Sequence, residues 1–116
     1  MPELGSPPDA GAVRSAHVHH RNGLSCTDKV YRDGKVHDAD RIDFLARYLE
    51  KLSEGIHAGA DVRGYFQWSL LDNFEWHSGY RERFGLVYVD YATGQRIPKD
   101  SAFWYGEVAA TNGQSI

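Results

Sequence analysis

Cysteines, long apolar runs and an excess of basic residues are missing from this sequence, and each absence excludes a class of protein. Cys26 is the only cysteine, so the chain can form neither a disulfide framework nor a cysteine-based metal site. No run approaches the roughly 18 apolar residues of a membrane span. With 13 basic and 16 acidic residues the net charge is −3, which gives no electrostatic basis for binding nucleic acid.

The N-terminal 21 residues show no hydrophobic period, and we expect them to be disordered. Residues 1–16 are rich in Pro, Gly and Ala and lack the features of a secretory leader, so a reduced, cytoplasmic setting is expected. His17, His19 and His20 have the His-x-His spacing of some metal sites. Because no carboxylate or cysteine accompanies them nearby, we expect no metal ion and no other cofactor.

Residues 40–58 carry the clearest helical pattern. Apolar side chains recur at spacings of 3, 4, 3 and 4 residues, at Ile42, Leu45, Leu49, Leu52 and Ile56. Asp38 is the expected N-cap and Gly59 the expected left-handed stop. The opposite side is charged, so this helix covers a larger body with one face.

The rest of the chain predicts an incomplete α/β fold. Residues 62–71 are rich in β-formers without clean alternation, which is typical of a strand buried on both faces of a parallel sheet. Residues 84–91 and 95–97 flank a turn and suggest a hairpin. A second helix is expected over 100–111, closed by Asn112-Gly113. One predicted strand cannot make a parallel sheet, so we expect the α/β fold to be incomplete.

The stretch WSLLDNFEW, residues 68–76, holds two indoles and two acids within nine residues. Aromatic residues make up 13% of the sequence and crowd between Tyr65 and Tyr105. Such a concentration directly after a buried strand predicts that the chemistry of this protein lies here.

WSLLDNFEW and its surroundings resemble the C-terminal quarter of a glycoside hydrolase family 1 β-glucosidase. The stretches that carry the resemblance are NGLSCTDKV, DGKVHDADRIDFLARYLEKL, GYFQWSLLDNFEW, GYRERFGLVYVDY and PKDSAFWYGEV, in the order and at the spacing of the family. The resemblance covers roughly 90 residues and implies that residues 22–116 form about the last two βα units of a (β/α)₈ barrel. The strand at 63–71 would be the eighth, the helices at 40–58 and 100–111 the seventh and eighth, and residues 72–97 the last loop.

The resemblance also implies a sugar site. Glu75 resembles the acid that binds the outer hydroxyls of a non-reducing glucose, and its alternative is a solvated loop acid. Trp68 and Trp76 resemble the indoles of the pocket floor, and Phe84 a further wall, with core packing as the alternative for Trp68 and Phe84. Asp72 and Asn73 are expected to fix the loop through local Asx-type bonds.

Both catalytic carboxylates of a retaining β-glucosidase are absent from this chain. The mechanism requires a nucleophile and an acid/base about 5–5.5 Å apart. In the family the nucleophile lies in Thr-Glu-Asn-Gly, where this chain has His20-Arg21-Asn22-Gly23. Nothing corresponds to the Asn-Glu-Pro motif of the acid/base. Arg21 cannot act as a nucleophile, so the chain alone is expected to be inactive.

A shift of reading frame is one explanation for the departure. Residues 17–21 can be written CAC-GTA-CAT-CAC-CGA, which shifted by one base and completed with one G encodes Thr-Tyr-Ile-Thr-Glu. Under this hypothesis residues 1–21 are an out-of-frame leader of a normal enzyme that hydrolyses β-glucosides or oligosaccharides. The alternatives are a non-catalytic sugar-binding protein, and a remnant that self-associates or pairs with a separate chain through its exposed strand edges.

Overall fold

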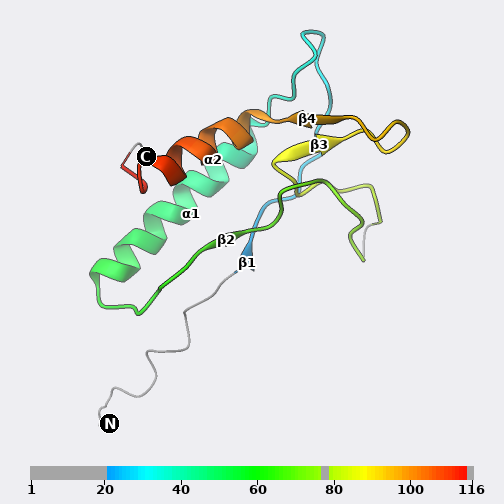
Figure 1. Ribbon diagram of the computed structural model, residues 1–116. Helices are drawn as coiled ribbons and strands as arrows, with labels where there is room; N and C mark the ends of the chain where they lie inside the picture. Colours follow the sequence, from blue (N-terminus) through cyan, green and yellow to red (C-terminus); the bar gives the residue numbers. More distant parts are fainter. Residues whose placement is uncertain (1–20, 77–78, 115–116) are drawn as a thin grey trace.

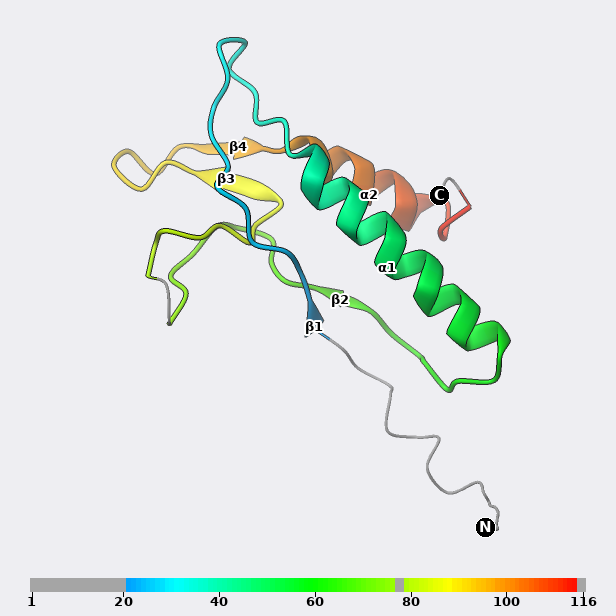
Figure 2. The same ribbon diagram turned by 180° about the vertical axis from the view of Figure 1, so that it is seen from behind.

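A computed structural model of the chain describes residues 21–76 and 79–114. The elements are β1 (Arg21–Asn22), α1 (Ala39–His57), β2 (Phe66–Gln67), β3 (Val87–Val89), β4 (Arg96–Pro98) and α2 (Asp100–Ala110). The two helices lie side by side, and the strands form two separate two-stranded sheets, β1 with β2 and β3 with β4 (Figure 1). Seen from behind, β1 and β2 run together below α1, while β3 and β4 project beyond the start of both helices (Figure 2).

Helix α1 confirms the predicted period and the position of the predicted N-cap, but not a capping bond from its side chain. Leu45 is fully buried, and Gly59 has a φ of 109°, as a left-handed stop requires. Asp38 is indeed the residue that precedes the helix, yet its side chain makes no capping bond to α1. Its carboxylate instead contacts Arg41 and Ser101, so it joins the starts of the two helices.

The long strand predicted over 62–71 is wrong in extent, and β1 was not predicted as a strand. Residues Phe66–Gln67 alone form β2, which pairs in parallel with β1, Arg21 opposite Phe66 and Asn22 opposite Gln67. The backbone N–H of Trp68 continues the ladder by donating to the carbonyl of Asn22 at 2.7 Å. The length of a strand depends on the strands that pair with it. Within the described residues, β2 pairs with one strand of two residues, β1.

The predicted hairpin is present with shorter strands. β3 and β4 pair antiparallel, with Val87 opposite Pro98 and Val89 opposite Arg96. The N–H of Gly94, whose φ is 79°, donates to the carbonyl of Asp90 and closes the turn. Leu71 forms a parallel bridge to Val87, so the end of the segment after β2 is joined to the hairpin.

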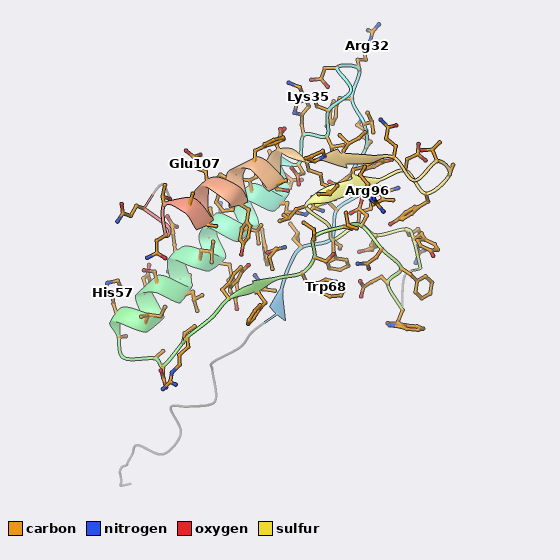
Figure 3. All side chains as sticks on the ribbon, in the orientation of Figure 1. Arg32, Lys35, His57, Trp68, Arg96 and Glu107 are labelled. Atoms are coloured by element: carbon orange, nitrogen blue, oxygen red, sulfur yellow. The ribbon has the colours of Figure 1, made fainter. Side chains whose placement is uncertain are left out.

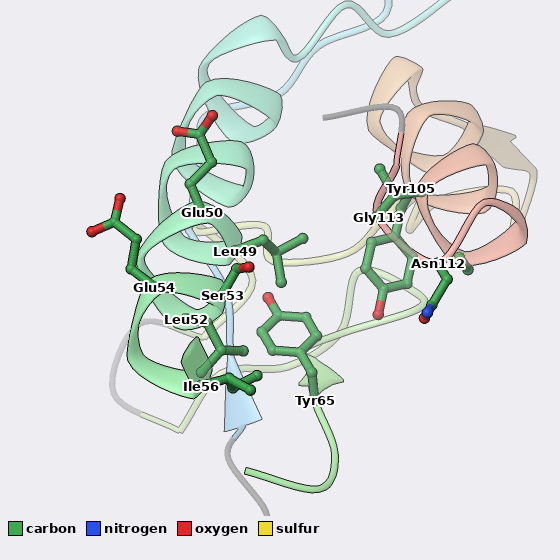
Figure 4. A pocket seen from close by; sticks show the side chains of 12 residues that line it. Leu49, Glu50, Leu52, Ser53, Glu54, Ile56, Tyr65, Tyr105, Asn112 and Gly113 are labelled. Atoms are coloured by element: carbon green, nitrogen blue, oxygen red, sulfur yellow. The ribbon is translucent and has the colours of Figure 1, made fainter. Parts of the chain in front are cut away.

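Helix α2 confirms the second predicted helix to within one residue, and Gly113 follows it with a φ of 82°. An open groove of about 790 Å³ separates the C-terminal halves of α1 and α2 (Figure 4). Its walls include Leu49, Leu52, Ile56, Tyr65 and Tyr105. The apolar stripe of α1 is therefore covered near its start and open near its end.

The hydrophobic core is small for the number of apolar residues. Among the described residues the buried apolar side chains are Val36, Leu45, Leu86 and Val108, while Phe66 is 54% and Leu70 67% exposed. A parallel sheet normally has both faces covered. The exposed side chains on and after β2 fit a barrel that is not closed.

No helix in the described part of the chain is long and apolar enough to cross a membrane.

Candidate functional site

The structure brings Trp68 and Glu75 together. The indole Nε1–H of Trp68 donates to Oε2 of Glu75 at 3.4 Å, and both side chains are partly buried. Trp68 lies where β2 ends, beneath the hairpin (Figure 3). Glu75 and Gly79 exchange two backbone hydrogen bonds, at 2.7 Å and 2.5 Å. This pair presents an indole plane and a carboxylate side by side, which are the groups that a sugar ring and its hydroxyls can contact.

Trp76 and Phe84 occupy different surroundings. The ring of Trp76 is 86% exposed and packs edge-on against Phe74, with the centroids 5.3 Å apart. Phe84 is partly buried, and its backbone carbonyl accepts a bond from the N–H of Ser69 at 3.1 Å. The predicted pocket residues thus lie around one segment, in which the side chains of Trp68 and Glu75 are in contact.

β1 places position 21 beside this segment. The carboxyl ends of parallel strands meet at the same edge of a sheet, and Arg21 lies opposite Phe66, two residues before Trp68. Gly23 permits the close approach, since a Cβ at this position would lie 2.0 Å from the backbone oxygen of Trp68. The backbone at position 21, which the family resemblance assigns to the nucleophile, therefore lies next to β2. The chain continues from the end of β2 to Glu75.

A buried row of alternating charges supports the site segment, and the sequence analysis missed it. In order, the row consists of Asp38, Arg41, Asp28, Lys99, Asp72 and Arg83, with ion pairs between neighbours at 2.5 to 2.8 Å. The side chains of Arg41, Lys99, Asp38 and Asp72 are completely buried. The sequence held one signal, because Arg41 lies four residues before Leu45 on the buried side of the helix.

Burial and pairing act in opposite directions on these charges. Burial by itself raises the pKa of Asp28, but hydrogen bonds from Arg41 and Lys99 outweigh it and hold this pKa below the usual range. Burial likewise acts to lower the pKa of Arg41, and the carboxylates of Asp28 and Asp38 raise it above its ordinary value. Both groups are charged at neutral pH, as an alternating row of ion pairs requires.

Asp72 fixes the loop in a way other than predicted. Its carboxylate accepts the backbone N–H groups of Gly85 at 2.9 Å and Val89 at 3.3 Å, far along the sequence, instead of forming a local Asx-type bond. Asn73 does bond locally, through its amide to the carbonyl of Leu71 at 3.1 Å. The residue before the aromatic loop is therefore tied to the hairpin.

The described residues contain no group of three or more His, Cys, Asp and Glu side chains that could hold a metal ion. Cys26 is partly buried, and burial raises the pKa of its thiol. The candidates His17, His19 and His20 lie outside the described residues, as does the leader predicted over residues 1–21 except for Arg21.

Comparison with known proteins agrees with this arrangement. Residues 16–114 match the family described as Glycosyl hydrolase family 1. Beta-glucosidase A of Thermotoga maritima is 52% identical over 92 residues, which make up 79% of this chain and 21% of that protein. A bifunctional beta-D-glucosidase/beta-D-fucosidase of Bifidobacterium breve is 58% identical over 88 residues, 72% of this chain and 19% of its own length.

The solved structures give the same result. The family 1 β-glucosidase from Thermotoga maritima superposes with a TM-score of 0.81 at 50% identity, and covers 84% of this chain and 22% of its own. The same enzyme in complex with deoxynojirimycin superposes equally well. The chain thus spans about a fifth of the length of the relatives it matches, and its α/β fold is part of an unclosed (β/α)₈ barrel. At this identity and coverage, the chain belongs to glycosyl hydrolase family 1.

Proposed function

We propose that this chain is the C-terminal part of the barrel of a retaining β-glucosidase, and that it carries the sugar-binding but not the catalytic groups. The observation that carries the proposal is the pairing of Trp68 with Glu75 at the end of β2. An ionised carboxylate accepts hydrogen bonds from two neighbouring hydroxyls, and an indole face packs on the C–H face of the same ring. The complex of the Thermotoga maritima relative with deoxynojirimycin, which is sugar-like, supports this ligand class.

Trp76 and Phe84 complete the proposed site. Trp76 offers an exposed indole one residue after Glu75, and Phe84 lies on the segment that bonds to Ser69. No carboxylate stands at position 21, so the chain by itself binds a β-glucoside without hydrolysing it.

The lone cysteine supports a cytoplasmic setting.

Titration of the purified chain with deoxynojirimycin, followed by tryptophan fluorescence, tests the proposal. Glu75→Gln keeps the shape and removes the charge, so we expect affinity to fall by about tenfold or more, the equivalent of about 1.4 kcal/mol. Glu54→Gln is the matched control, since Glu54 is an exposed residue of α1. Release of nitrophenol from an aryl β-glucoside should stay at the buffer rate. Equal effects of the two Gln variants, or turnover by the chain, would contradict the proposal.

A further inference from the structure

Asp72 is held from four directions. Its carboxylate accepts Nζ of Lys99 at 2.8 Å, Nη1 of Arg83 at 2.7 Å and the backbone N–H groups of Gly85 and Val89. Its own backbone N–H donates to the carbonyl of Val87 at 3.0 Å. A fully buried carboxylate with this many donors has one position available to it. Asp72 is therefore the fixed point from which the aromatic loop departs.

Lys99 supplies the charge at the centre of this arrangement. Its side chain is completely buried, and Nζ lies between the carboxylates of Asp72, at 2.8 Å, and Asp28, at 2.7 Å. Its backbone N–H donates to the carbonyl of Leu86 at 2.9 Å, at the point where β4 passes into α2. A charge out of contact with water must be paired, so Lys99 holds both acids in place. The helices are thereby linked to the aromatic loop.

The held position reaches both members of the sugar-binding pair. Ser69 follows Trp68 directly, and it is fixed by backbone bonds to Phe84 at 3.1 Å and Leu86 at 2.9 Å. Glu75 lies three residues after Asp72. Residues 84–89, which end in β3, therefore bond both to Ser69, directly after Trp68, and to Asp72, three residues before Glu75. Every charged group in the row lies within residues 28–99, so the row itself is formed by this chain.

We propose that Lys99 is a positioning residue for the sugar site, and that through Asp72 it sets the relative placement of Trp68 and Glu75. The inference rests on the sugar-binding role proposed for that pair. Because its side chain is completely buried, Lys99 acts through Asp72 and not by direct contact with the ligand. Its effect is on the geometry of the Trp68–Glu75 contact, which a residue that merely contributed to overall stability would leave unchanged in the folded protein.

The test compares Lys99→Met with Lys51→Met in the full chain. Lys51 is an exposed lysine of α1, so its variant makes the same chemical change away from the buried row. The readout is the NMR signal of the Trp68 indole N–H, assigned by replacing each tryptophan with Phe in turn. Trp104, on α2, is the internal reference. We expect a shifted Trp68 signal and about tenfold weaker binding of deoxynojirimycin for Lys99→Met only, with partial recovery in Lys99→Arg.

An unshifted Trp68 signal in folded Lys99→Met would overturn the proposal. If that variant does not fold, Arg83→Gln decides, because it removes the second cationic partner of Asp72 at a side chain that is partly exposed. A shift there supports the inference and an unchanged signal overturns it. If the wild-type chain binds no sugar while Lys99→Met still shifts the Trp68 signal, the proposed function fails and the positioning role stands.

Discussion

The carboxylate of Asp38 caps α2, although Asp38 itself precedes α1. Oδ1 accepts the backbone N–H of Ser101, in the first turn of α2, at 2.9 Å, and Oδ2 accepts the Ser101 hydroxyl at 2.5 Å. The first N–H groups of a helix lack partners within the helix, and an acid at that end also interacts favourably with the helix dipole. The Asp38 side chain thus accepts hydrogen bonds from the first turn of α2 and also pairs with Arg41. In this way it holds the two helices together at one end.

Removing the two sides of this contact should have unequal effects. Ser101→Ala loses one hydroxyl bond and leaves the N–H bonded, so we expect a loss of about 1–2 kcal/mol in the free energy of unfolding. Asp38→Ala removes a carboxylate partner of the buried Arg41 guanidinium, so we expect the free energy of unfolding to fall by about 3–5 kcal/mol. Urea unfolding followed by circular dichroism measures both. Equal losses would show that Arg41 does not depend on Asp38.

The helices could be predicted because their information is local. The period of α1 and the stop at Gly59 are contained in one stretch of sequence, and both are confirmed. The role of Asp38 could not be predicted, since its partner Ser101 lies 63 residues away. An acid before a helix has the same appearance whether it caps that helix or another.

Gly85 should tolerate no side chain, in contrast to Gly55. A Cβ on Gly85 would lie 2.3 Å from the backbone nitrogen of Asp72 and 2.5 Å from the carbonyl carbon of Leu71, where the backbone cannot yield. We expect Gly85→Ala to lower the free energy of unfolding by about 3 kcal/mol. Gly55 lies inside α1 with nothing within 4 Å, so Gly55→Ala should stabilise by about 1 kcal/mol. Melting temperatures moving in the same direction would contradict this.

His37 should make stability depend on pH. Its Nδ1 lies 2.7 Å from Asp100 and its Nε2 2.8 Å from Asp33, so only the protonated ring donates to both acids. The bonds to Asp100 and Asp33 raise the pKa of His37 above its usual value. A raised pKa in the folded state gives stability that is fully present below the unfolded value of about 6.5 and is lost as the pH rises through the folded value.

The matched pair for this prediction is His37→Gln with His57→Gln, at the exposed end of α1. We expect His37→Gln to lower the melting temperature most at about pH 5.5–6, with a difference that shrinks toward about pH 8. His57→Gln, which removes a ring whose Nδ1 lies 2.8 Å from the carbonyl oxygen of Ser53, is the baseline for this difference. A constant difference across this range would mean that the charge of His37 does not contribute.

The residues of the proposed sugar site could be predicted from the sequence, but the buried charges that hold them in place could not. Trp68 and Glu75 are close in sequence, so their contact follows from one turn of the chain. Asp28, Lys99 and Arg83 come from separate segments, and no periodicity relates them. A sequence does not show which charges a fold buries together, so the sequence made no prediction for these three residues. The strand predicted over 62–71 was too long for a related reason, since its length depends on pairing with other strands.

Exposed apolar groups on and after β2 should drive self-association. Phe66 and Leu70 are more than half exposed, and β2 is paired on one edge by β1 within the described residues. Phe66→Glu and Leu70→Glu together should increase the monomer fraction in size-exclusion chromatography with light scattering. Val30 and Tyr31 are also exposed but lie in a separate loop, and the control that replaces these two residues by Glu should leave the monomer fraction unchanged. Association equal in both double variants would place the contact elsewhere.

The reading-frame hypothesis makes a prediction on the protein itself. β1 ends next to β2, and its register places Arg21 opposite Phe66. Restoring the shifted reading gives five substitutions, His17→Thr, Val18→Tyr, His19→Ile, His20→Thr and Arg21→Glu, which put β-branched and aromatic residues before the strand. We expect the melting temperature to rise by about 4–8 °C, the equivalent of about 1 kcal/mol in a small domain.

The matched control keeps Arg21 and carries the other four changes. If those four changes give the same rise, strand pairing is responsible, and the carboxylate at position 21 affects chemistry and not stability. No rise in either variant would contradict the hypothesis that residues 17–21 stand in place of a barrel strand.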